Sequence, residues 1–176
     1  MQQKRYCVIY ADPGWRFEVW SEMGLDRSAD NPYGTSLLAA IKALDMASIA
    51  ADDCALFICA TFPMLPQALE VMTAWGFAYA SGLPWAKDRV GTGYWFRNQS
   101  ELLLVGTRGD VPAPTPGTQW AGLISAPVRE HSRKPDAFYE LIEVYFPNLA
   151  KIELFARHAR QRWDWGADAP EPVAAE

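Results

Sequence analysis

The chain has 176 residues and a net charge of −5, and half of its residues are hydrophobic. This length supports one sizeable core but not two, and the apolar fraction excludes a wholly disordered chain. No apolar run reaches the roughly 18 residues that a membrane helix needs, and we expect no secretory signal. The cysteines, Cys7, Cys54 and Cys59, form no CxxC pair, so we expect neither disulfides nor a metal site.

These features predict a soluble, cytoplasmic protein with a single domain over residues 1–168, followed by a disordered tail at 169–176. The net negative charge argues against an extended, sequence-blind grip on phosphates. The charge is uneven, however, because residues 87–162 carry 11 basic and 8 acidic side chains. That weakly basic region permits contact with a polyanion but does not require it.

In the first half of the chain, apolar runs that end in turn residues alternate with segments of helical periodicity. These patterns predict a buried strand at 6–11, short helices at 36–43 and 46–51, a strand at 54–60 and a helix at 65–75. Asp45 is the expected N-cap of the second helix, and Gly76 is expected to end the third.

The second half repeats this alternation with longer loops. It predicts strands at 77–84 and 101–107, a long loop at 108–122, a short strand at 124–126, a helix at 135–146 and a final strand at 151–156. Continuous apolar strands alternating with helices predict an α/β fold, with a mainly parallel sheet covered by helices on both faces.

In such sheets ligands bind beyond the carboxyl ends of the strands. Three predicted strand ends then share one rim, at Asp12-Pro13, Thr61-Phe62 and Arg157-His158. We therefore expect a site built around Asp12 and Arg157.

Asp12-Pro13-Gly14-Trp15 is a favourable turn sequence, and an ordinary turn explains it without any function. It also suits one particular chemistry. The N6 amine of adenine is a poor nucleophile because its lone pair is delocalised into the ring. Two acceptors, the Asp12 carboxylate and the Pro13 carbonyl, would stabilise the charge that develops during methyl transfer, and Trp15 would stack on the base.

Four sequence blocks, in order, resemble the MT-A70 class of N6-adenine methyltransferases. They are YADPGW at 10–15, GTGYWFRNQSELLLVGTRG at 91–109, REHSRKPDAFYELIE at 129–143 and KIELFARHARQRWDWG at 151–166. A DPPW-like motif alone is a weak signal, whereas four blocks at these spacings are specific. The resemblance covers residues 6–166, nearly the whole chain.

The resemblance implies a Rossmann-like, S-adenosyl-L-methionine-dependent methyltransferase fold in which the catalytic motif precedes the cofactor segment. It implies catalytic roles for Asp12, Pro13 and Trp15, cofactor contacts from Asp12, Lys134, Phe155 and Arg157, and substrate contacts from Gly14, Asn98, Gln99 and Glu101. On charge and position alone, and not from the resemblance, we also expect Arg129, with Arg133 beside it, to contact a phosphate or ribose of the substrate.

Several of these residues also have plainer explanations. Glu101 would pair with Arg97 or Arg108, and Arg157 would belong to a solvated edge. Lys134 would solvate a helix start, although a cation there opposes the helix dipole. His131 and His158 are expected to be packing or surface residues, and the proposed chemistry does not need them.

The chain departs from the family pattern at two places. Gly14 replaces the second proline of the motif, which predicts a looser pocket with the acceptor atoms retained. The usual G-N-[EQ] ending reads Gly166-Ala167-Asp168.

The expected partner is a nucleic acid, DNA rather than RNA, reached through the loops 16–34, 87–98 and 108–122. Three alternatives stay open: an RNA methyltransferase, an inactive methyltransferase-like scaffold subunit and a small-molecule methyltransferase. No membrane contact is expected, and a dimer is not excluded.

Overall fold

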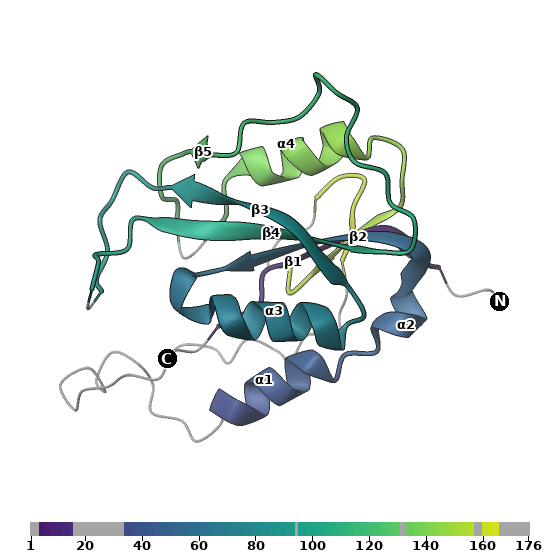
Figure 1. Ribbon diagram of the computed structural model, residues 1–176, viewed down its shortest axis with the longest axis horizontal. Coiled ribbons are helices and arrows are strands. Elements are labelled where there is room, and N and C mark those ends of the chain that lie inside the picture. Colours follow the sequence, from purple (N-terminus) through teal and green to yellow (C-terminus); the bar gives the residue numbers. More distant parts are fainter. Residues whose placement is uncertain (1–3, 16–33, 94, 131–132, 157–159, 166–176) are drawn as a thin grey trace.

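The computed structural model describes residues 4–15, 34–93, 95–130, 133–156 and 160–165. Seven strands form one sheet in the order β5-β3-β4-β2-β1-β6-β7 (Figure 1). The strands are β1 (Tyr6–Ala11), β2 (Ala50–Ala60), β3 (Ala78–Ala86), β4 (Ser100–Arg108), β5 (Ile124–Ser125), β6 (Lys151–Leu154) and β7 (Asp164–Trp165). The helices are α1 (Gly34–Lys42), α2 (Met46–Ile49), α3 (Leu65–Ala74) and α4 (Asp136–Tyr145), with a 3-10 turn, η2, at Phe62–Met64.

The strands around β1 are parallel. β1 pairs in parallel with β2 and β6, β6 with β7, and β3 with β5, whereas β4 is antiparallel to both β2 and β3. The prediction of a mainly parallel α/β sheet is confirmed. The antiparallel pairs arise because β3 and β4 form a hairpin, with no helix between them to return the chain.

Two layers of helices cover the sheet, α1 and α3 on one face and α4 on the other (Figure 1). β2 shows why both faces are dry. Leu56 and Ile58 pack towards α3, while Phe57 and Cys59 pack towards α4, as the two-residue period of a strand requires. A strand buried on both faces has to be apolar throughout, which explains the continuous run CALFICA.

Two local details differ from the sequence prediction. The helix predicted at 46–51 ends at Ile49, because Ala50 turns to extended backbone and pairs with Tyr6 at the start of β1. Asp45 caps that helix as predicted, accepting a bond from the Ser48 amide at 3.2 Å. The two-residue strand β7 was not predicted, because so short a segment carries no periodic signal.

The start of β2 lies four residues before the predicted one, and the other ends of the remaining elements lie within two residues of the prediction, the usual uncertainty of helix and strand boundaries. The predicted final strand is shorter, since β6 ends at Leu154. The tail predicted at 169–176 lies outside the described residues. Among the described residues, no helix is both long enough and apolar enough to cross a membrane.

Candidate active site

A buried charge cluster lies where β1 ends. Lys134, just before α4, places its Nζ 3.2 Å from Oδ1 of Asp12 and 2.8 Å from Oε2 of Glu101. Lys87, which follows β3, bonds the other oxygen of Glu101. The side chains of Lys134, Glu101 and Asp12 are 9%, 13% and 20% exposed. Four segments that are distant in sequence therefore bring two cations and two carboxylates to one place.

These partners keep the cluster ionised. Burial alone would lower the pKa of Lys134, but the carboxylates of Asp12 and Glu101 raise it above its usual value. Burial alone would raise the pKa of Glu101, yet Lys134 and Lys87 together lower it. Lys134 therefore stays charged although its side chain is largely shielded from solvent, which suits it to binding an anionic group such as a carboxylate.

The Asp12-Pro13-Gly14-Trp15 segment forms a tight turn directly after β1. The Trp15 amide donates to the Pro13 carbonyl at 2.8 Å, and the Trp15 indole donates to the Cys59 carbonyl of β2 at 2.7 Å. The turn is thus fixed to two neighbouring strands. A carbonyl oxygen has two lone pairs and an ionised carboxylate about four acceptor sites, so the Pro13 oxygen and Asp12 both keep capacity for further donors.

Trp15 is half-buried against the core that includes β2 and α3, so one side of its ring is structural. Gly14 is exposed, and among the described residues no atom lies within 4 Å of a Cβ added there. The turn is therefore held by Trp15 and does not depend on contacts made by residue 14.

Two further features mark the same rim. Phe155, directly after β6, has a φ of 65°, a conformation that a bulky residue adopts only when its surroundings hold it there. Thr61 follows β2, and among the described residues its buried Oγ1 has no hydrogen-bond partner. The parallel pairing of β1, β2 and β6 places Asp12 and Thr61 at one end of the sheet, as predicted. Phe155 lies there too, because β6 ends at Leu154, whereas the predicted Arg157-His158 end lies outside the described residues.

An arginine-lined cavity of about 600 Å³ lies beside the cluster; Arg89, Val128, Arg129, Glu130 and Arg133 line it. Arg129 is held by Asp136 at the start of α4, at 2.7 Å, and Arg133 approaches the same carboxylate at 3.8 Å. Arg133 directly precedes Lys134 in the sequence. Three guanidinium groups are balanced by Glu130 and Asp136, which leaves one excess positive charge and favours an anionic ligand.

Asn98 and Gln99 are exposed on the loop between β3 and β4. Gln99 exchanges bonds with Lys87: its carbonyl accepts from the Lys87 amide at 2.8 Å, and its side-chain amide donates to the Lys87 carbonyl at 3.0 Å. Gln99 therefore holds the loop that carries Lys87.

The family model named MT-A70 matches residues 6–168. The chain belongs to the MT-A70 family. It is 34% identical to the type II methyltransferase M.MunI of Mycoplasma sp., over 97% of this chain and 81% of that protein. It is 30% identical to the N(6)-adenosine-methyltransferase catalytic subunit METTL3 of Homo sapiens and 31% identical to an MT-A70-like N(6)-adenosine-methyltransferase of Arabidopsis thaliana, over 92% and 91% of this chain. The chain spans only 27% and 23% of those two longer proteins.

Membership of the MT-A70 family confirms both the resemblance and the Rossmann-like methyltransferase fold predicted from the sequence. Within that frame the structure brings together Asp12, Glu101 and Lys134. The alternative pairing of Glu101 with Arg97 or Arg108 is wrong, because Lys134 and Lys87 are its partners.

Lys87 was not predicted for the MT-A70 site. A lysine that follows a strand carries no pattern of its own, and only the hairpin pairing of Trp85 with Glu101 brings it close. Arg157, His131, His158, the loop 16–33 and the segment 166–168 lie outside the described residues, so their predicted roles stay predictions.

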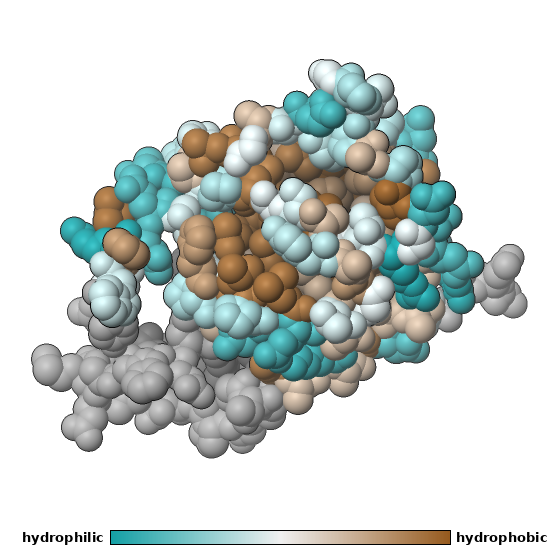
Figure 2. Space-filling view, in the orientation of Figure 1, coloured by the Kyte–Doolittle hydropathy of each residue, from teal (hydrophilic) through white to brown (hydrophobic). Residues whose placement is uncertain are grey.

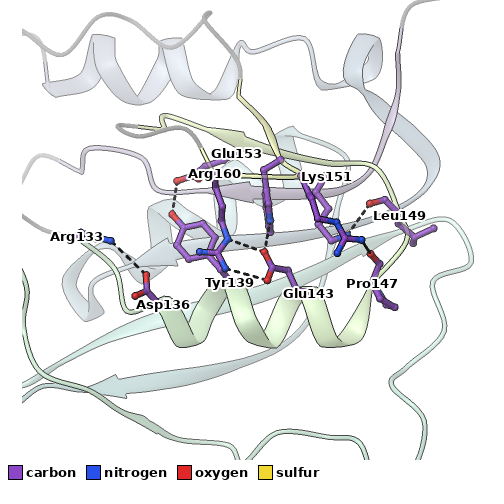
Figure 3. Close-up of polar contacts among 11 residues, drawn as sticks. Arg133, Asp136, Tyr139, Glu143, Pro147, Leu149, Lys151, Glu153 and Arg160 are labelled. Atoms are coloured by element: carbon purple, nitrogen blue, oxygen red, sulfur yellow. Dashed lines mark hydrogen bonds and ion pairs between the residues drawn. The ribbon is translucent and has the colours of Figure 1, made fainter.

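A second polar network lies along α4 (Figure 3). Arg160 bonds both oxygens of Glu143, at 2.8 and 3.2 Å, and its guanidinium lies 4.5 Å from the centre of the Tyr139 ring. The Tyr139 hydroxyl donates to Glu153 of β6 at 2.9 Å. Burial raises the pKa of Glu153 to about 7. This network joins β6 and the segment before β7 to α4.

Proposed function

We propose that the protein transfers a methyl group from S-adenosyl-L-methionine to the N6 amine of adenine in DNA. The observation that carries the proposal is the fixed turn after β1, in which the Asp12 carboxylate lies 3.2 Å from Nζ of Lys134 and the next residue, Pro13, presents a carbonyl oxygen held by the Trp15 amide. This arrangement offers adjacent acceptors for an amino group and a cation for the carboxylate of an amino acid.

The described residues fit S-adenosyl-L-methionine, which supplies the transferable methyl on its sulfonium sulfur. Lys134 is charged and suited to the donor's carboxylate, and Asp12 offers oxygens to its cationic groups. Thr61 adds a buried hydroxyl whose partner is missing among the described residues. The strained Phe155 and the predicted contact Arg157 follow β6 on the same rim.

In the proposed reaction, Asp12 and the Pro13 carbonyl accept hydrogen bonds from the two N6 hydrogens and orient the lone pair towards the methyl group. The N–CH3 bond forms as the S–CH3 bond of the donor breaks, which leaves S-adenosyl-L-homocysteine, and the methylated nitrogen releases one proton to solvent. Acceptors that are already fixed need no reorganisation as positive charge develops on nitrogen, which lowers the barrier. Trp15 closes the pocket around the base, and Glu101 holds Lys134 in place. Holding the two reactants in line supplies much of the remaining acceleration.

DNA is favoured over RNA as the substrate by the relatives. The type II methyltransferase M.MunI matches along most of both chains, whereas the match to METTL3 covers 27% of that protein. The arginine-lined cavity gives a DNA phosphate a place beside the reacting base. A duplex substrate requires that the target base leave the stack, at a cost of a few kcal/mol.

Sequencing total DNA from cells that express the protein, and mapping modified adenines, tests the proposal and yields any recognition sequence. We expect N6-methyladenine at one short motif, absent with an Asp12→Ala variant. Parallel incubations of the purified protein with labelled donor and DNA, RNA or free nucleosides separate the alternatives. Label confined to RNA or to nucleosides would overturn the DNA assignment, and calorimetry without any donor binding would favour an inactive scaffold.

A further inference from the structure

Two large aromatic side chains stand in solvent at the tip of the β3–β4 hairpin. Trp95 is 92% exposed and Phe96 is 84% exposed, the highest values among the large exposed hydrophobic side chains of the described residues. The loop that carries them projects from one end of the sheet (Figure 1), and Figure 2 shows it standing apart from the body, with apolar side chains among hydrophilic ones. Side chains that stay exposed gain nothing from folding, and adjacent exposed aromatic rings of this size commonly mark a binding surface.

Hydrogen bonds join the two sides of this loop among its described residues, 87–93 and 95–99. Beyond the Lys87–Gln99 pair, the Gly91 amide donates to Asn98 at 2.6 Å and the Asn98 amide donates to Thr92 at 3.2 Å. At Gly93 a Cβ would lie 1.9 Å from the Phe96 carbonyl oxygen, so only glycine allows the chain to close there. These contacts join the two sides of the loop below Trp95 and Phe96. We call the described residues on the two sides, 87–93 and 97–99, the stalk.

The stalk begins at the candidate active site. Ala60, at the carboxyl end of β2, pairs with Leu102, so the loop that precedes β4 extends beyond the rim where Asp12 lies. Lys87 and Glu101, at the two sides of the stalk's base, belong to the buried charge cluster. Arg89, two residues further along, lines the arginine cavity. The aromatic tip and the proposed base pocket are thus parts of one end of the molecule.

Charge and size favour a nucleic acid as the ligand of this tip. Arg97 follows the aromatic pair directly, and its side chain is held against the loop by the Gly91 carbonyl at 3.2 Å, while Arg89 lies nearer the base of the loop. Trp95 and Phe96 together offer about 300–500 Å², well below the roughly 800 Å² per partner of a stable protein interface. Exposed aromatic rings beside guanidinium groups are instead typical of surfaces that stack on bases.

We propose that Trp95 and Phe96 insert into the base stack of duplex DNA beside the target adenine and fill the space that it leaves on flipping. This rests on the proposed function. The arginine cavity binds the backbone next to the flipped nucleotide, and the aromatic pair stabilises the opened duplex while Asp12 and Pro13 hold the base. The tip therefore contributes to opening the duplex and not to the methyl transfer itself.

The test compares two duplexes that carry the recognition sequence found by mapping, one with the target adenine paired to thymine and one with an abasic site opposite it. A Trp95→Ala, Phe96→Ala double variant should methylate the paired duplex about 10- to 100-fold more slowly than the wild type. On the duplex with the abasic site, the rate of the double variant should stay within about threefold of the wild-type rate. That substrate has already lost the base pair that Trp95 and Phe96 help to break. Trp95→Phe, which keeps an aromatic ring, should restore most of the rate on the paired duplex.

Tyr79→Ser is the matched control, because Tyr79 is 56% exposed at the far end of β3 and should leave both rates unchanged. Equal losses of methylation rate on the two duplexes, or no loss on either, would contradict the proposed insertion of Trp95 and Phe96. A change from dimer to monomer in sedimentation of the double variant would assign the tip to contact between copies of the chain and would also overturn it. If the wild type methylates no adenine, the proposed function fails by itself. The insertion of Trp95 and Phe96 is then tested by the affinity for a mixed-sequence duplex in fluorescence anisotropy. Equal affinities of the double variant and the wild type would reject it.

Discussion

The two ends of α4 carry two charged networks of opposite character. At its start, Lys134 places a cation at the positive end of the helix dipole, an unfavourable position that the carboxylates of Asp12 and Glu101 offset. Near its end, Glu143 places an anion at the negative end of the dipole, which is also unfavourable by itself, and Arg160 offsets it through two bonds. The two networks differ in place: the first lies at the rim that carries the Asp12 turn, whereas the second joins α4 to the segment before β7.

The largest expected effect is at the first network. Asp12→Ala should reduce turnover by about 10²-fold or more, the usual loss when one preorganised acceptor is removed. It should also lower the melting temperature without unfolding the protein, because Lys134 loses one carboxylate partner and keeps Glu101. Single-turnover methylation and thermal unfolding measure the two quantities. Asp52→Ala is the control, since the Asp52 side chain is a 91% exposed carboxylate on the surface. A rate near the wild-type value would show that Asp12 does not act on the amine.

Lys134→Ala should weaken donor binding by about 10- to 100-fold, because the donor's carboxylate loses its charge-assisted bond. Isothermal titration calorimetry with S-adenosyl-L-methionine measures this directly. Lys42→Ala removes an ion pair with Glu70 that is largely exposed and should leave the affinity unchanged. Equal affinities for the Lys134 variant and the wild type would place the donor elsewhere.

At the second network the effect should be on stability alone. Glu143→Gln removes the charge that pairs with Arg160 and leaves one acceptor for the Arg160 and Trp163 donors. We expect a loss of about 1–2 kcal/mol in the free energy of unfolding and a turnover within about threefold of wild type. Glu140→Gln, at an exposed position of the same helix, is the control. A large loss of turnover in a stable Glu143 variant would erase the distinction between the two networks.

The smallest effect is in the pH dependence of stability. Because burial raises the pKa of Glu153 to about 7, from 4.5, its neutral form stabilises the fold. That contribution is complete below about pH 4.5 and is lost as the pH rises through 7. Glu153→Gln should therefore gain melting temperature over the wild type, by about 3 °C, between pH 5 and pH 8. Glu143 has a lowered pKa, so its contribution is instead lost as the pH falls. A Glu153 difference that does not vary with pH would contradict the raised pKa.

The sequence predicted the fold well where apolar runs were long and uninterrupted. β1, β2, α3 and α4 follow directly from their periodicity, and the order of four sequence blocks indicated the family. Turn residues marked the candidate site because Asp12 ends a buried strand. Periodicity gave no information on strand direction, so the antiparallel hairpin had to come from the structure.

The partners of each charge could not be predicted, since ion pairs depend on distances between segments far apart in the chain. Glu101 and Lys134 were each expected at the site on separate grounds, but their direct bond was not foreseen. The exposure of Trp95 and Phe96 could not be predicted either, because aromatic residues in a sequence usually indicate a core.

The open surroundings of Gly14 have a consequence for how this motif can vary. Its neighbours place no steric demand on a side chain, and the stiffness of the turn comes from the two bonds of Trp15. Among the described residues, nothing packs against this position. We therefore expect that Gly14 can be replaced singly when the motif is redesigned, as long as Trp15 and its two bonds are kept.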